Sequence, residues 1–180
     1  MKKLILLLIA VIITGCNEKN LMNTPTKKVE MFFENYQTLS DNVIDDLNKV
    51  TAEEELFNTE NREKYIELMK KHYQDLTYEI KDEKIDGDTA LVTVEIEVTD
   101  YSKALEEANT YLEENRSEFE ENGEYNEFLF MDYKIKKLSE VKDTVKYTLD
   151  LTLSKINDVW TLDNISDIDE QKINGVYDYS

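Results

Sequence analysis

The 180-residue chain carries 40 Asp and Glu against 21 Lys and Arg, with one Cys, one His, one Pro and four Gly. This net charge of −19 excludes the class of nucleic-acid binders that rely on basic side chains, and the single Cys and His exclude internal disulfides, cysteine-rich zinc sites and multi-histidine metal sites. Its 41% hydrophobic residues are enough for the core of one ordinary domain plus a short extra segment.

The N-terminus has the pattern of an export signal. Two lysines after Met1 precede ten residues, 4–13, that contain only Leu, Ile, Ala and Val. A membrane-spanning helix needs about 20 apolar residues, and this run ends at Thr14-Gly15-Cys16 before a strongly polar stretch. The pattern therefore favours a cleaved signal peptide over residues 1–15, with an uncleaved anchoring helix as the weaker alternative.

The segment Ile13-Thr14-Gly15-Cys16 resembles the lipobox of bacterial lipoproteins, in which small residues precede an invariant cysteine. The resemblance implies that Cys16 carries a thioether-linked diacylglycerol and becomes the mature N-terminus on the extracytoplasmic side of a bacterial membrane. Two acyl chains are enough for stable anchoring. Residues 16–23 then form the lipidated cysteine and a polar tether. The alternative is a secretory signal in which the cysteine is incidental.

Three amphipathic helices are expected next, because apolar residues recur at helical spacing. The first begins with Thr24 as N-cap and Pro25 at the first helical position. A second helix is capped by Ser40-Asp41, and a third runs from about 59 to 74. Their apolar stripes contain Val29, Phe32, Phe33 and Tyr36, then Val43, Ile44, Leu47 and Val50, then Tyr65, Leu68, Met69 and His72.

The periodicity then changes to the alternation of β-strands. Residues 76–81 and 90–98 alternate around the turn Asp86-Gly87-Asp88, which predicts a hairpin with one apolar and one polar face. A second hairpin is expected over 145–162, with Asn157-Asp158 at its turn. Between the hairpins, helical spacing predicts a helix from Ser102 to about 120, a break at Asn122-Gly123, and a helix over 125–138.

Together these elements predict an α+β domain over residues 24–165, in which the helices cover one face of a four-stranded antiparallel sheet. The helices of 102–138 are an insertion between the two hairpins, and residues 166–180 form an acidic tail that is either free or docked. The element order, with Thr24-Pro25, the Ile85–Thr89 turn and the final Trp160 strand, resembles the NTF2-like (cystatin-like) fold. The resemblance implies a cone-shaped pocket, which the insertion could cover, but not an activity.

His72 is the only candidate catalytic residue that titrates near neutrality. It could act as a general base, as the NTF2-like resemblance implies, although a lone His on an apolar stripe is more often a hydrogen-bonded packing residue. The oxygen-rich segment 163–170 lacks the Gly and Glu that an EF-hand loop needs, so we interpret it as a solvated surface. No metal or cofactor is predicted, and most of the tyrosines are interpreted as core residues.

We therefore expect a non-catalytic, lipid-anchored extracytoplasmic domain that binds a protein or a small ligand near the membrane. The alternative hypothesis is a small NTF2-like enzyme with His72 as general base. An enclosed pocket of several hundred Å³ with His72 pointing inward would favour the enzyme. A filled cone with an exposed apolar patch would favour the binding domain.

Overall fold

The computed structural model describes residues 22–53 and 56–178. The predicted signal peptide and Cys16 lie outside the described residues. The helices are α2 (Pro25–Gln37), α3 (Asp41–Glu53), α4 (Thr59–Asp75), α5 (Ser102–Glu114), α6 (Glu127–Glu140), α7 (Asp167–Ile173) and the 3-10 helix η1 (Arg116–Phe119). The strands are β1 (Thr77–Asp86), β2 (Thr89–Thr99), β3 (Glu120–Glu121), β4 (Glu124–Tyr125), β5 (Thr144–Ile156) and β6 (Val159–Leu162).

The main sheet has four antiparallel strands in the order β1-β2-β5-β6, which confirms the predicted α+β class. The two hairpins join through β2 and β5, which pair in register from Thr89 opposite Ser154 to Thr99 opposite Thr144. Alternate residues of β2, from Ala90 to Val98, are buried, and their neighbours in sequence are exposed or half-buried. This alternation is the sequence pattern that predicted the hairpins.

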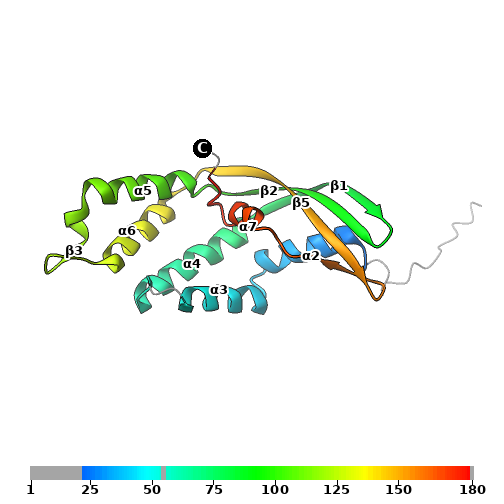
Figure 1. Cartoon of the computed structure of the whole chain (residues 1–180), viewed down its shortest axis with the longest axis horizontal. Coiled ribbons are helices and arrows are strands. Elements are labelled where there is room, and N and C mark those ends of the chain that lie inside the picture. Colours follow the sequence, from blue (N-terminus) through cyan, green and yellow to red (C-terminus); the bar gives the residue numbers. More distant parts are fainter. Residues whose placement is uncertain (1–21, 54–55, 179–180) are drawn as a thin grey trace, which may run out of the picture.

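The helices α2, α4 and α7 lie on the apolar side of the sheet (Figure 1). Val29 and Phe33 of α2 are completely buried in the core, and Ile173 of α7 is 1% exposed there. The predicted N-cap is confirmed, because the Thr24 side chain accepts a hydrogen bond from the Lys27 amide at 3.1 Å. The segment after β6 thus packs on the same core as α2.

The insertion between the hairpins differs from the prediction in two ways. The helix that was expected to reach about residue 120 ends at Glu114, because Asn115 leaves the helical region and its side chain caps the Tyr111 carbonyl at 3.0 Å. The chain then forms η1 and the short β3–β4 hairpin. The α5–α6 unit also projects beyond the end of the sheet beside α4, so it extends the molecule and does not cover the sheet (Figure 1).

One side-chain expectation was also wrong, and one core residue was not predicted. The hydroxyl of Ser40 does not cap α3, since it is buried with no hydrogen-bond partner among the described residues, while its carbonyl accepts from the Ile44 amide. Tyr101, which no periodic pattern placed in the core, is only 4% exposed. It follows β2 directly and packs on α4, a position that strand periodicity does not cover.

The start of the described chain is fastened to the β5–β6 turn. The Asn23 side-chain amide donates to the Asp158 carbonyl at 2.8 Å, and its oxygen accepts from the Trp160 amide at 2.9 Å. Both turn residues, Asn157 and Asp158, have positive φ, as a two-residue hairpin turn of type I′ requires. The chain therefore enters the fold at the hairpin end, opposite the α5–α6 unit (Figure 1).

Candidate functional site

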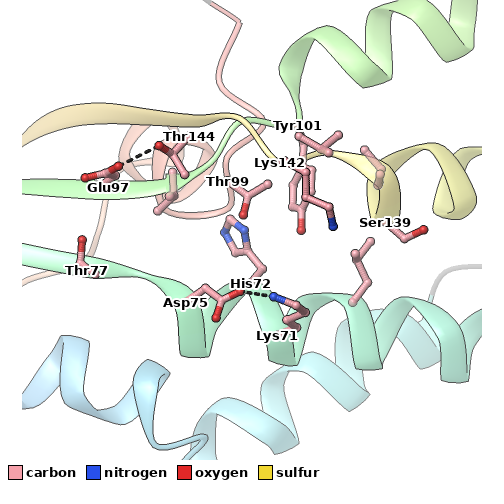
Figure 2. A pocket seen from close by; sticks show the side chains of 14 residues that line it. Lys71, His72, Asp75, Thr77, Glu97, Thr99, Tyr101, Ser139, Lys142 and Thr144 are labelled. Carbon is pink, nitrogen blue, oxygen red and sulfur yellow. Dashed lines mark hydrogen bonds and ion pairs between the residues drawn. The ribbon is translucent and has the colours of Figure 1, made fainter.

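A cavity of about 310 Å³ lies where the sheet meets the α5–α6 unit, and we call it the His72 cavity. Its walls come from the end of α4, the start of β1, the end of β2, the end of α6 and the start of β5 (Figure 2). The lining residues are Leu68, Lys71, His72, Asp75, Thr77, Glu97, Val98, Thr99, Tyr101, Leu138, Ser139, Val141, Lys142 and Thr144. The volume is at the lower end of the range for small-molecule sites.

His72 stands in the wall of this cavity with one nitrogen bonded and one free. Its Nε2 lies 2.8 Å from the Ile173 carbonyl oxygen, and because a carbonyl only accepts, Nε2 carries the proton. Nδ1 is then an acceptor, and it is buried without a hydrogen-bond partner among the described residues. Burial lowers the pKa of His72 more than the Ile173 carbonyl and the charge of Asp75 raise it, so the ring is neutral near pH 7.

Polar groups surround the His72 ring from several elements. The Tyr101 ring lies 5.1 Å from it, and burial raises the pKa of Tyr101 to about 12, so its hydroxyl stays protonated. Lys71 and Asp75 form an ion pair below the ring, and Lys142 has no ion pair among the described residues (Figure 2). The Glu97 carboxylate points away from His72 and accepts a hydrogen bond from Thr144 at 2.7 Å.

This geometry is better suited to binding than to proton abstraction. An activated base normally has a third group that orients it and stabilises its charged form. The Nε2 of His72 is held by a backbone carbonyl and not by a carboxylate, and its pKa is lowered, so the imidazolium is disfavoured. The polar groups that the cavity offers to a ligand are the acceptor Nδ1 of His72, the protonated hydroxyl of Tyr101 and the side chain of Lys142. A ligand that donates a hydrogen bond to Nδ1 would complete this set.

Acidification is expected to destabilise the protein through His72. Because the folded-state pKa lies below the unfolded value of about 6.5, the unfolded state binds more protons, so His72 opposes folding progressively as the pH falls below about 6.5. The His72→Gln variant keeps an amide donor for the Ile173 carbonyl but does not titrate. In urea unfolding between pH 7.5 and 5, the wild type should lose up to about 1.4 kcal/mol per pH unit more than the variant. Parallel pH profiles would contradict this result.

Sequence reasoning found His72 but not its surroundings. Tyr101 and Lys142 flank predicted elements without belonging to them, and Ile173 is 101 residues away from His72. Only the tertiary fold brings Tyr101 and Lys142 to the cavity and the Ile173 carbonyl to the His72 ring. A signal that could have pointed to this cavity is the aromatic residue Tyr101, which comes shortly after the predicted strand over 90–98.

A groove of about 880 Å³ lies between α4 and α6. Leu68, Tyr133 and Ile135 form its floor, and charged side chains such as Lys64 and Asp132, which are paired at 2.9 Å, form its rim. Polar contacts join the two helices, since Asn61 donates to the Phe128 carbonyl at 3.0 Å.

Within residues 22–53 and 56–178, no helix is both long and apolar enough to cross a membrane. The same residues contain no group of three or more His, Cys, Asp or Glu side chains placed to hold a metal ion. The second half of the oxygen-rich segment 163–170 is helical and belongs to α7, whose N-cap is Ser166, since its hydroxyl accepts from the Asp169 amide at 3.1 Å.

The fold and its cavities define an α+β domain with helices on one face of an antiparallel sheet. No family model matches the chain, and no curated protein matches it. Among solved structures, the chain is similar to the crystal structure of a "putative lipoprotein (ycdA)" from Bacillus subtilis subsp. subtilis str. 168, with 14% identity and a TM-score of 0.42. The match covers 90% of this chain and 48% of that one, so the chain spans about half the length of that protein.

Proposed function

We propose that the chain is a lipid-anchored domain on the extracytoplasmic side of a bacterial membrane, and that it binds a small ligand in the His72 cavity. The anchoring part rests on the Ile13–Cys16 sequence pattern. The binding part rests on one observation, the buried and unpartnered Nδ1 of His72 in the cavity wall. A buried acceptor without a partner costs about 1–3 kcal/mol, and a ligand that donates a hydrogen bond to it would remove this cost.

The other polar groups narrow the type of ligand. Tyr101 offers a hydroxyl that stays protonated, and Lys142 offers a positive charge with no ion pair among the described residues. A small molecule with a hydroxyl or amide donor, together with an acceptor or anionic group, matches both. This ligand class fits a cavity of about 310 Å³ and does not require a second protein.

An enzyme that uses His72 as general base is the second candidate. The observation that favours it is the same Nδ1 lone pair, which accepts no hydrogen bond from the described residues. The lowered pKa and the backbone carbonyl on Nε2 argue for binding over catalysis.

The single histidine makes a direct test simple, because ¹⁵N-histidine labelling gives one imidazole to observe by NMR. The protein is titrated with fractions of a size-filtered small-molecule extract from bacterial cells. We expect one fraction to shift the Nδ1 resonance of His72 toward the hydrogen-bonded value. Lys142→Gln should weaken this shift, and the control Lys136→Gln, which is outside the cavity lining, should not.

Two outcomes would change the conclusion. If no fraction moves the His72 resonance, the binding proposal is wrong. If the active compound is recovered chemically altered, and His72→Gln prevents the change, the enzyme hypothesis replaces it.

A further inference from the structure

A second cavity lies on the other side of α4, between α2, α3, α4 and α7, with a volume of about 340 Å³. We call it the tyrosine cavity. Its lining consists of Tyr36, Val43, Asp46, Leu47, Val50, Tyr65, Met69, Tyr73, Glu170, Ile173, Asn174 and Val176. The neighbours His72 and Tyr73 on α4 therefore line different cavities. No Lys, Arg or His is present among these lining residues, although the His72 cavity contains two lysines.

The charges of the tyrosine cavity all have one sign. Asp46 of α3 and Glu170 of α7 are exposed carboxylates on different elements, and neither has an ion pair within the described ranges. Both carboxylates act on the tyrosine that lines this cavity. Burial is the main cause of the raised pKa of Tyr36, and the negative charges of Glu170 and Asp46 raise that pKa further. An anion would meet repulsion here, while a cation would meet two carboxylates that nothing in the described structure neutralises.

The remaining lining residues combine tyrosines with aliphatic side chains. The rings of Tyr36 and Tyr73 lie 4.9 Å apart at 74°, and the Tyr73 hydroxyl is fixed by donation to Asn174 Oδ1 at 3.1 Å. Tyrosine faces attract cations through the ring quadrupole, and desolvated sites strengthen that attraction. Leu47 and Ile173, which are 7% and 1% exposed, form an apolar floor, while Val50 is 58% exposed and marks the entrance.

We propose that the tyrosine cavity binds a small organic ammonium compound with an apolar body. Its positive group would lie near Asp46, Glu170 and the tyrosine rings, and its apolar body would pack on the aliphatic floor. This inference goes beyond the proposed function, because it concerns a different cavity and requires neither the lipid anchor nor a ligand at His72.

The test uses the full chain, purified from membranes in an uncharged detergent, and isothermal titration calorimetry with defined probes. Benzyltrimethylammonium is the cationic probe, benzyl alcohol the neutral one and benzenesulfonate the anionic one. All three carry the same ring. We expect benzyltrimethylammonium to bind at least tenfold more tightly than either of the others, with an affinity that falls as salt is added.

Neutralising each carboxylate separates this site from the general negative charge of the protein. Asp46→Asn and Glu170→Gln should each weaken the binding of benzyltrimethylammonium about fivefold, a value reduced for the exposure of both groups. The matched controls are Asp45→Asn and Asp167→Asn, which remove one charge from the same helices outside the cavity lining. These controls should change the affinity less than twofold.

The proposal fails if the three probes bind equally, or if the control variants weaken binding as much as the cavity variants do. It also fails if benzyltrimethylammonium does not bind at all. The tyrosine cavity is tested by calorimetry with its own carboxylate variants, and the His72 cavity by the Nδ1 resonance and Lys142→Gln, so the two proposals can fail separately.

Discussion

Replacement of Gly175 by alanine is expected to destabilise the fold more than any other single change proposed for this protein. Gly175 has a φ of +68°, and an added Cβ would lie 2.0 Å from the Thr99 carbonyl oxygen and 3.1 Å from Cε1 of His72. The left-handed backbone costs about 1–2 kcal/mol for a residue with a side chain, and forced overpacking costs about 1–3 kcal/mol more. The Tyr101 amide also donates to the Gly175 carbonyl at 2.7 Å, so movement there would disturb the His72 cavity.

Urea unfolding of the variant should therefore show a loss of about 3 kcal/mol or more. The matched control is Gly123→Ala, because Gly123 has a φ of +83° but nothing within 4 Å of its added Cβ. Gly123→Ala should lower the free energy of unfolding only by the cost of the left-handed backbone, about 1–2 kcal/mol. Equal losses for the two variants would show that the contact between residues 99 and 175 is not a tight one in solution.

Replacement of Cys16 by serine is expected to move the protein from the membrane fraction to the soluble fraction. If Cys16 carries the lipid, its removal leaves the mature domain without acyl chains, and single weak contacts do not hold a protein stably on a bilayer. The measurement combines cell fractionation with intact-mass analysis, and the wild type should show the added mass of diacylglycerol on residue 16. Asn17→Ser, one position later, should remain membrane-bound and modified.

If the Cys16→Ser protein stays in the membrane fraction and wild-type Cys16 carries no added mass, an uncleaved apolar helix holds the chain. Secretion of the wild type into the medium would instead indicate an ordinary signal peptide. Either result removes the lipid anchor from the proposed function and leaves both cavity proposals to be judged on their own tests.

The main sheet could be predicted from the sequence because its signal is local. Strand residues such as Val92, Val94 and Ile96 alternate with polar neighbours, and they are completely buried in the fold. The turn at Asn157-Asp158 was predicted for the same reason, since both residues tolerate positive φ. Local pattern was also enough to place the insertion between the hairpins.

The cavities could not be predicted, because their residues are distant in sequence and owe their positions to packing. Asp46 and Glu170 line the same cavity only because α3 and α7 both supply walls to it beside α4. The early end of α5 at Asn115 was missed for a related reason. Helical spacing continues to Phe119, but that residue packs on Phe130 from η1, a 3-10 helix, at a ring distance of 5.3 Å.

The attachment of Asn23 to the β5–β6 turn also determines how the protein would bear mechanical load. Only six residues, 17–22, separate Cys16 from Asn23, so with a lipid on Cys16 the hairpin end stays within about 25 Å of the anchor. A force on the tether would act on the β5–β6 hairpin through the two hydrogen bonds of Asn23. One joins Asn23 to the Asp158 carbonyl in the turn, and the other joins it to the Trp160 amide in β6. The α5–α6 unit lies at the far end of the long axis, so with a lipid on Cys16 it is the part of the domain that can reach farthest from the anchor (Figure 1).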